Sequence, residues 1–119
     1  MDKNFYITTP IYYPSARPHM GHAYSSIIAD FFSRFKTIDG YKVCFLTGTD
    51  EHGLKIQRSA EKEGLDPLKF CDQISKTFRD LSKTLNLTNT DFIRTTEDRH
   101  KKTVQHLWKE LEKNDDIYL

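Results

Sequence analysis

The stretch FYITTPIYYPSARPHMGHAY, residues 5–24, changes from a strand-like to a helix-like pattern. Its first part, residues 5–9, is aromatic and β-branched and ends at a proline, which is typical of a β-strand. Prolines within residues 10–18 then exclude a helix, because proline lacks a backbone N–H and clashes with the preceding turn. From residue 19 to about residue 38 the apolar residues recur at helical spacing. The stretch therefore predicts a strand, a rigid loop and a helix in succession.

One wide apolar stripe runs along the predicted helix of residues 19–38. Its members recur three and four positions apart. A stripe of this width is typical of a helix that packs on a sheet, so we expect it to face the sheet. The stripe comprises Ile27, Ile28, Phe31, Phe32, Phe35 and Ile38.

Two further segments are predicted to be strands, residues 42–47 and, more weakly, residues 92–95. Helical patterns separate the strands from one another. This alternation is typical of an α/β fold with a parallel sheet and flanking helices. Parallel sheets that are buried on both faces usually contain more strands than these. We therefore expect residues 1–119 to be the first part of a longer protein.

Three more helices are predicted along the chain. The first is polar and ends at Gly64, and the second begins at Pro67 with Asp66 as its cap. The last opens at residues 96–98, where acidic side chains suit the positive end of the helix dipole. We expect the last two helices to bury apolar stripes. These stripes comprise Ile74, Phe78, Leu81 and Leu85 on the one helix, and Val104, Leu107, Trp108 and Leu111 on the other.

Composition and charge limit the classes of protein that fit. A chain of 119 residues supports one domain, and 37% hydrophobic and 29% charged residues are ordinary for a globular protein. The formal net charge of +1 argues against a strong field for DNA or a membrane surface. No apolar run approaches the roughly 20 residues of a membrane span, and the N-terminus lacks the apolar core of a signal peptide. Cys44 and Cys71 are too few and too far apart for a zinc motif or a disulfide framework, so we expect buried free thiols and a cytoplasmic protein.

Two histidines, His19 and His22, flank Gly21 where the predicted helix begins. In open α/β sheets the carboxyl ends of the strands carry the ligand sites, and a helix N-terminus attracts anions. Residues three apart on a helix share a face, and a glycine between them lets a planar group approach the backbone. The pattern predicts a seat for a nucleotide, with its phosphates facing the imidazoles.

Two alternatives stay open for these histidines: they could only cap the helix, or they could bind a metal. The chain contains neither Gly-x-Gly-x-x-Gly nor Gly-x-x-x-x-Gly-Lys-Ser/Thr, the two common phosphate-binding loops. A nucleotide would therefore need another device to hold it.

The loop GTDEHG, residues 48–53, follows the second predicted strand and so reaches the same edge of the sheet. We expect Asp50 to project toward the space beside Tyr13. A carboxylate beside an aromatic wall suits a cationic amine. The alternative is that Asp50 only caps the helix that starts near Gly53.

Several motifs carry a resemblance to a known family. PIYYPSARPHMGH, residues 10–22, resembles the first signature of the class I aminoacyl-tRNA synthetases, whose core is His-Ile-Gly-His or a close variant. TTPIYYP at residues 8–14, FLTGTDEHG at residues 45–53 and FIRTTEDRH at residues 92–100 resemble the methionyl-tRNA synthetase family within that class. The resemblance covers the chain from Phe5 to Leu119.

The resemblance implies a Rossmann-type catalytic domain, of which residues 1–119 would be the N-terminal half. Its substrates would be methionine, ATP with magnesium, and tRNA(Met). The methionine carboxylate would attack the α-phosphorus of ATP, pyrophosphate would leave, and the adenylate would acylate the 3′ end of the tRNA. Such catalysis consists of positioning and charge stabilisation without a covalent enzyme intermediate.

The resemblance also implies a role for individual residues. His19 and His22 would be catalytic and contact the ATP phosphates, Gly21 would lie under the adenine, and His52 would lie on the ATP side. Asp50 would bind the methionine ammonium group. The wall of the methionine pocket would comprise Tyr13 and the backbone around Pro10 and Ile11.

The chain departs from the full family pattern. The second signature, Lys-Met-Ser-Lys-Ser, is missing, and Ser75-Lys76 and Ser82-Lys83 look like solvated positions on a helix. The connective insertion, with its possible zinc site, and the anticodon-binding domain are also absent. We therefore expect the isolated chain to be inactive or nearly so, although the full-length protein would be a ligase.

Three other functions stay open. The chain could belong to another His-x-Gly-His nucleotidyltransferase that forms a small-molecule adenylate without tRNA. It could be a metal hydrolase that uses His19, His22, Asp50 and His52. It could also be a piece without enzymatic activity that binds a nucleotide or a partner protein through an unfinished sheet.

Overall fold

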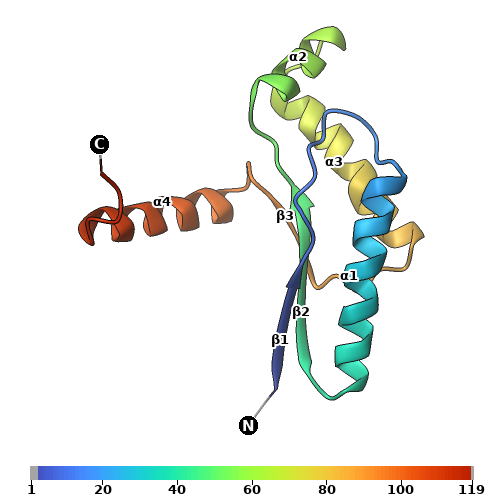
Figure 1. The fold of residues 1–119 in the computed structure, drawn as a ribbon. Coiled ribbons are helices and arrows are strands. Elements are labelled where there is room, and N and C mark those ends of the chain that lie inside the picture. Colours follow the sequence, from blue (N-terminus) through green and yellow to red (C-terminus); the bar gives the residue numbers. More distant parts are fainter. Residues whose placement is uncertain (1–2, 119) are drawn as a thin grey trace.

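The computed structural model describes residues 3–118 and contains a three-stranded parallel sheet with helices on both sides (Figure 1). Met1, Asp2 and Leu119 lie outside the described residues. The predicted parallel α/β fold with flanking helices is confirmed. The elements are β1 (Asn4–Thr8), α1 (Met20–Ile38), β2 (Lys42–Thr49), α2 (Leu54–Lys62), α3 (Pro67–Thr84), β3 (Asp91–Arg94) and α4 (Asp98–Lys113).

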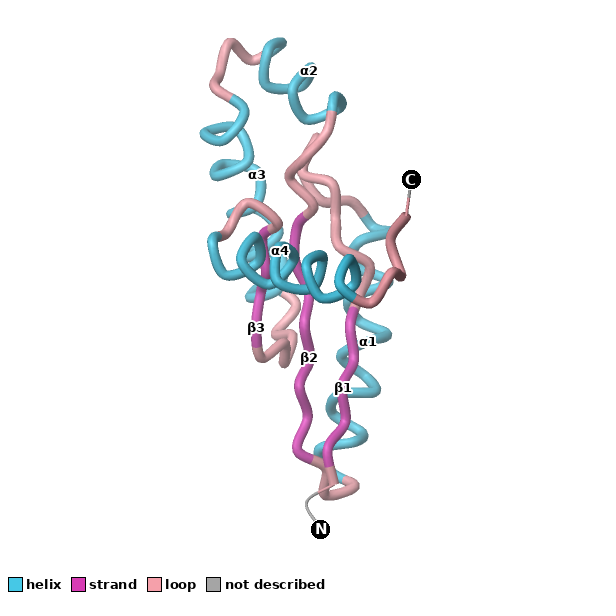
Figure 2. The backbone as a smooth tube through the Cα atoms, turned by 90° about the vertical axis from the view of Figure 1, so that its left-hand side faces the viewer, coloured by secondary structure: helices cyan, strands magenta, loops and turns pink. Residues whose placement is uncertain are grey.

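The strands lie in the order β1-β2-β3, so that β2 is central (Figure 2). Asn4 is paired with Lys42 at the start of β1, and Leu46 is paired with Asp91 at the start of β3. All carboxyl ends therefore meet at one edge of the sheet. Tyr12 extends this edge beyond β1, because its N–H donates to the Gly48 carbonyl at 2.9 Å and its carbonyl accepts from the Asp50 N–H at 2.9 Å.

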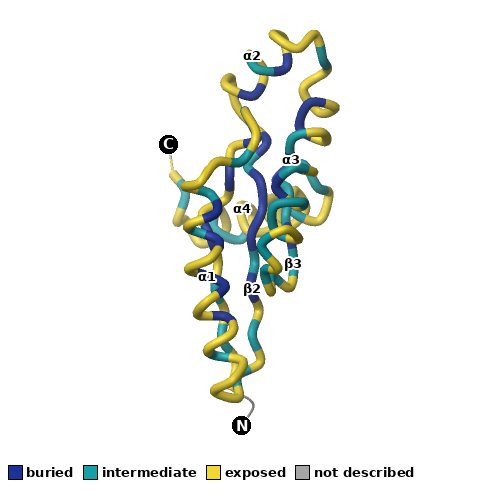
Figure 3. Tube along the Cα trace, turned by 90° about the vertical axis from the view of Figure 1, so that its right-hand side faces the viewer, coloured by how far each residue is buried: buried dark blue, intermediate teal, exposed yellow. Residues whose placement is uncertain are grey.

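Helix α1 presents to the sheet the face opposite to the one we predicted. All the large apolar side chains of the predicted stripe are exposed, from 41% for Ile28 to 87% for Ile38. In Figure 3 most of the length of α1 is coloured as exposed. The side chains that face the sheet are small or polar: Ala23, Ser26, Ala29, Asp30 and Ser33. Small residues let the helix lie close to the strands, and the polar ones find partners there.

The polar residues of the inner face of α1 are bonded to other elements. Ser26 shares a hydrogen bond of 2.9 Å with the Tyr12 hydroxyl, and Ser33 shares one of 3.0 Å with the Thr88 hydroxyl. Asp30 accepts from both the N–H and the hydroxyl of Thr88, each at 2.6 Å, and from Arg34 at 2.6 Å. Buried polar side chains in folded proteins are nearly always hydrogen-bonded, and these partners allow the polar face of α1 to be buried.

Helix α3 largely follows the prediction. Asp66 caps it, accepting from the Leu68 and Lys69 N–H groups at 3.0 and 3.2 Å, and Pro67 follows in the first turn. Phe78 is buried in a small core with Tyr12 and Phe92, while the other members of its predicted stripe are half-buried. A second core cluster joins α3 to α2 and comprises Ile56, Ala60, Phe70 and Cys71.

The side chains of the α3 Ser-Lys pairs divide between surface and interior. Lys76 and Lys83 are exposed and lie beside Asp80, as expected for solvated helix positions. Ser75 is buried and Ser82 is half-buried, so the prediction of solvation is wrong for the serines.

Helix α4 stands away from the sheet on the side opposite to α1 (Figures 1 and 2). The prediction that its apolar residues face inward is wrong: Val104, Leu107 and Trp108 are each about half exposed, and no residue of α4 is buried. The helix is attached at its N-terminal end, where Arg99 pairs with Asp91 and donates to the Phe92 carbonyl at 3.0 Å.

The expectation of two buried thiols is half wrong, since Cys71 is buried but Cys44 is exposed.

Candidate functional site

A hollow of about 320 Å³ lies at the carboxyl edge of the sheet, where the loop after β1 meets the first turns of α1 and α2. It brings together four of the predicted site residues: Ile11, Tyr13, His19 and His22. The other lining residues are Tyr12, Ser15, Ala16, Arg17 and Lys55. The remaining predicted residues, Pro10, Gly21, Asp50 and His52, do not line it.

Two of the lining residues, Arg17 and Lys55, were missed by the sequence reasoning. They add two cationic side chains to a hollow whose lining contains no carboxylate. The position of Arg17, inside the motif of residues 10–22, could have indicated it. Lys55 lies just after the loop of residues 48–53, which is a weaker signal. The charge of the lining suits an anionic ligand.

His19 and His22 close the N-terminus of α1 with each other's help. His19 is the cap residue, and its Nδ1 accepts from the Gly21 N–H at 3.0 Å. The Nδ1 of His22 accepts from the His19 N–H at 3.1 Å, and the two ring centroids are 3.8 Å apart. Because both Nδ1 atoms accept, each neutral ring carries its proton on Nε2. One alternative for these histidines was that they cap the helix, and this capping is observed. It uses both Nδ1 atoms and leaves both Nε2–H groups available as donors.

The ring of His22 packs in an aromatic environment. Tyr12 and Phe78 meet it edge-on, with centroid distances of 4.8 and 5.1 Å. Burial lowers the pKa of His22, and the neighbouring His19 lowers it further. His22 is therefore a neutral donor near pH 7. Tyr12, which the sequence reasoning did not single out, supports this ring from the core, whereas Tyr13 is 55% exposed and borders the hollow.

Gly21 has a local reason to lack a side chain. A Cβ atom there would lie 2.9 Å from Cε1 and 3.1 Å from Nδ1 of the His19 ring. Any larger residue would displace the ring that caps the helix. Glycine at this position thus preserves the arrangement of the two imidazoles.

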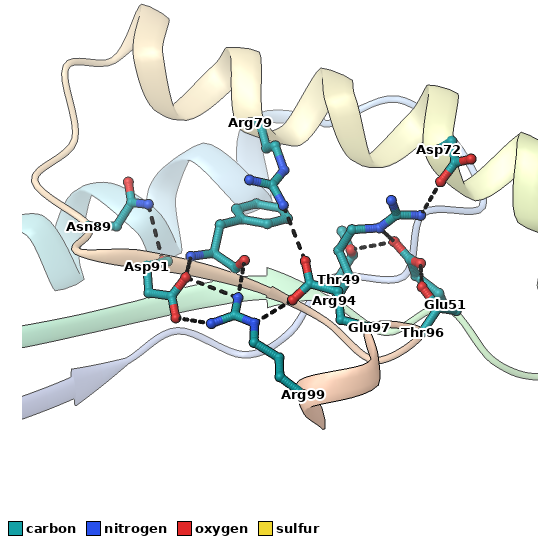
Figure 4. Close-up of polar contacts among 11 residues, drawn as sticks. Thr49, Glu51, Asp72, Arg79, Asn89, Asp91, Arg94, Thr96, Glu97 and Arg99 are labelled. Atoms are coloured by element: carbon teal, nitrogen blue, oxygen red, sulfur yellow. Dashed lines mark hydrogen bonds and ion pairs between the residues drawn. The ribbon is translucent and has the colours of Figure 1, made fainter. Parts of the chain in front are cut away.

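The loop after β2 is anchored by a buried ion pair that the sequence did not reveal (Figure 4). The Glu51 side chain is fully buried and accepts from Arg94 Nε at 2.7 Å and from the Thr49 hydroxyl at 2.8 Å. Thr96 donates to its other oxygen, and Arg94 also pairs with Asp72 of α3 at 2.6 Å. Hydrogen bonding to Glu51 raises the pKa of Arg94, which burial alone would lower. An arginine within the predicted strand of residues 92–95 was the available signal.

Asp50 precedes this anchor and is half-buried. Its Oδ1 accepts from the Thr95 hydroxyl at 3.4 Å. The alternative that Asp50 caps α2 is wrong, because the cap residue is Gly53 and makes no side-chain cap bond. The exposed His52 ring has its Nε2 3.3 Å from the Thr95 carbonyl and borders a different hollow, near Pro67.

Within residues 3–118 no three His, Cys, Asp or Glu side chains come together as metal ligands. The same described stretch contains no helix long and apolar enough to cross a membrane.

Known proteins are similar to this chain in sequence and in fold. The family model "tRNA synthetases class I (M)" matches residues 5–119. A mitochondrial methionine–tRNA ligase of Takifugu rubripes is 56% identical over 110 residues, which are 92% of this chain and 19% of that protein. The methionine–tRNA ligase of Rickettsia bellii (strain RML369-C) is 51% identical over 118 residues, which are 99% of this chain and 23% of that protein.

The solved structure of Mycobacterium tuberculosis methionyl-tRNA synthetase bound by methionyl-adenylate matches with a TM-score of 0.94 and 43% identity. The match covers 98% of this chain and 23% of that one. This agreement confirms the Rossmann-type architecture. The chain spans about a fifth of the length of the curated relatives it matches.

Proposed function

This chain belongs to the family of class I tRNA synthetases (M), and from that premise we propose that it is the N-terminal half of the catalytic domain of a methionine–tRNA ligase. The full-length protein would activate methionine with ATP to methionyl-adenylate and transfer it to tRNA(Met). The observation that carries the proposal is the pair of imidazoles whose Nδ1 atoms accept backbone hydrogen bonds and whose Nε2–H groups have no hydrogen-bond partner within residues 3–118.

The hollow suits the triphosphate of ATP. Two Nε2–H donors stand at a helix N-terminus, where the dipole favours anions, and Arg17 and Lys55 add positive charge. The donors are set before the reaction, because the cap bonds hold both rings in place. His19 and His22 would therefore stabilise the charge that develops on the phosphates while pyrophosphate leaves.

Magnesium would be bound by the nucleotide phosphates, because the hollow offers no carboxylate to hold it. The zinc expected in the connective insertion would lie outside residues 1–119.

The methionine subsite would lie beside the hollow. Asp50 would bind the ammonium group, and its N–H, which donates to the Tyr12 carbonyl at 2.9 Å, holds it to the segment that carries Tyr13. Tyr13, Ile11 and the backbone of Pro10 would face the thioether, which packs favourably on aromatic and apolar surfaces. Two contacts remain predictions: that of Gly21 with the adenine and that of His52 with ATP. The free thiols suit action in the cytoplasm.

A substrate comparison in the full-length protein tests the proposal. Pyrophosphate exchange into ATP should require methionine and should not proceed with leucine or pantoate. Asp50→Asn should raise the KM for methionine first, because it removes the charge opposite the ammonium group. Exchange driven by pantoate or phosphopantetheine would instead favour a small-molecule adenylate enzyme, and exchange by residues 1–119 alone would contradict the expected inactivity of the segment.

A further inference from the structure

Thr95 follows β3 directly and bonds to four consecutive residues, the last residue of β2 and the first three of the loop after it. It is buried, with 6% of its surface exposed. Its N–H donates to the Thr49 carbonyl at 3.1 Å, and its carbonyl lies 3.3 Å from His52 Nε2. Its side-chain oxygen accepts from the Glu51 N–H at 2.8 Å and lies 3.4 Å from Asp50 Oδ1. Thr95 thus bonds to three of the four residues of the loop that carries Asp50.

The threonine hydroxyl has a single proton, and its surroundings decide where that proton points. The Glu51 N–H occupies a lone pair of the oxygen. The remaining polar neighbour is the Asp50 carboxylate, which can only accept when ionised. Within residues 3–118 this carboxylate has no other hydrogen-bond partner. Among the described residues, the Thr95 hydroxyl is therefore the only group that orients the Asp50 carboxylate by a hydrogen bond.

The backbone around Asp50 is already fixed on both sides. Its own N–H donates to the Tyr12 carbonyl, and the next N–H donates to Thr95. The Glu51 side chain forms an ion pair with Arg94, which further restricts movement of the backbone next to Asp50. The freedom that remains is the rotation of the Asp50 side chain, and the Thr95 hydroxyl restricts it.

We propose that Thr95 is a positioning residue whose hydroxyl orients the Asp50 carboxylate toward the amino group of the amino-acid substrate. This inference rests on the proposed function of Asp50 as the ammonium-binding group. With Oδ1 held by Thr95, the other oxygen is left for the ammonium ion. Preorganising the carboxylate removes the ordering that substrate binding would otherwise require.

Thr90 provides a matched control at the opposite end of β3. Its hydroxyl oxygen accepts from the Phe45 N–H at 3.0 Å, so it also joins β3 to β2 through a backbone donor. It precedes β3, whereas Thr95 follows it, so it lies away from Asp50. Thr90→Val removes the same kind of bond between the strands without touching the proposed subsite.

The experiment uses the full-length protein with Thr95→Val, Thr95→Ser and Thr90→Val. Methionine binding without ATP is measured by calorimetry, and the KM values for methionine and ATP are measured by pyrophosphate exchange. We expect Thr95→Val to weaken methionine binding roughly 5- to 20-fold, the low end for a hydrogen bond to a charged group because this one is long. The KM for ATP should not change. Thr95→Ser, which keeps the hydroxyl, should restore methionine binding, and Thr90→Val should leave it intact.

Equal methionine affinity in Thr95→Val and wild type would overturn the positioning role, as would an equal loss in Thr90→Val. If Thr95→Val fails to fold, Thr95→Ala carries the same test, because it also lacks the hydroxyl. A wild-type protein that bound no methionine would overturn the proposed function and this inference with it. If the wild-type protein bound methionine and Thr95→Val bound it equally well, only the inference would be overturned.

Discussion

At the carboxyl edge of the sheet, buried polar side chains are paired with one another, whereas on the outward face of α1 large apolar side chains lie in solvent. Glu51 is fully buried yet bonded to Arg94, Thr49 and Thr96. Phe31 and Phe35, by contrast, are 63% and 53% exposed. Within the described residues no buried side-chain nitrogen or oxygen lacks a hydrogen-bond partner.

The difference shows which interactions fix the structure of residues 3–118. The polar edge is complete in itself, because every partner comes from residues of this chain. The apolar face of α1 contributes no burial here, although hydrophobic burial is the largest favourable term in folding. The geometry of the candidate site is therefore carried by hydrogen bonds and ion pairs more than by the most apolar surface. Substitutions in the two regions test this contrast.

Arg94→Met should destabilise the full-length protein strongly. The change leaves the buried Glu51 carboxylate without its counter-charge, which typically costs about 3–5 kcal/mol. Thermal unfolding measures the loss. The control is Arg58→Met on the surface of α2, which should have little effect. Equal stability of the two variants would mean that the ion pair does not hold the edge.

His19→Asn in the full-length protein should separate catalysis from helix capping. Asparagine is a good N-cap and can accept from the Gly21 N–H, so α1 should keep its stability. The Nε2–H donor is lost, and adenylate formation should fall about 10²–10³-fold, as when one preorganised donor is removed. Stopped-flow or exchange kinetics measure the rate. Methionine binding without ATP should not change, and a parallel fall in that binding would contradict the assignment of His19 to the phosphates.

Asp30→Asn should weaken the attachment of α1 to the loop before β3. The amide puts an NH₂ group in place of one of the carboxylate oxygens that accept from Thr88 and Arg34, a loss of about 1–3 kcal/mol. Faster hydrogen exchange of the Thr88 amide would report the change. The conservative control is Thr37→Val, which removes an exposed hydroxyl on the same helix.

The same carboxylate makes stability depend on pH. Burial alone would raise the pKa of Asp30, but hydrogen bonds from Arg34 and Thr88 outweigh burial and lower it. A lowered folded-state pKa gives stability that is fully present above the ordinary aspartate pKa of about 3.9 and is lost as pH falls through the folded-state value. Asp30→Asn should remove this contribution from the acid limb of the unfolding curve. An unchanged acid limb would show that Asp30 is not the group responsible.

Phe31→Gln should have the smallest effect on stability. Its side chain is largely exposed, and surface substitutions usually change the free energy of unfolding by less than about 0.5 kcal/mol. In the 119-residue chain it should instead reduce self-association, seen as a later elution in gel filtration. Phe45→Ala in the buried centre of β2 is the contrast, with an expected cost of about 3–5 kcal/mol. A wild-type segment that elutes as a clean monomer would contradict the role of the exposed face in association.

Local signals in the sequence were reliable where one residue decides the backbone. The prolines ended β1, and Asp66 with Pro67 began α3 as predicted. The His19-Met20-Gly21-His22 motif began α1, and its histidines lie in the hollow. Local chemistry was enough for these features, because caps and prolines act within one turn of the chain.

Features that depend on distant residues escaped the sequence. The apolar stripe of α1 predicted the wrong inward face, because the sheet accepts a small and polar face whose partners, Tyr12 and Thr88, come from other segments. The inward face predicted for α4 was wrong for the same reason: an amphipathic pattern names an apolar face but not what covers it.

The order of strands and helices, the caps and the motif of paired histidines depend on neighbours along the chain, so the amino-acid sequence predicts them. Contacts between distant segments determine which face of α1 is buried, that Glu51 pairs with Arg94 across 43 positions, and that Thr95 bonds to the loop of Asp50. A buried polar group requires a partner at hydrogen-bond distance, and folding alone determines which distant residue supplies it.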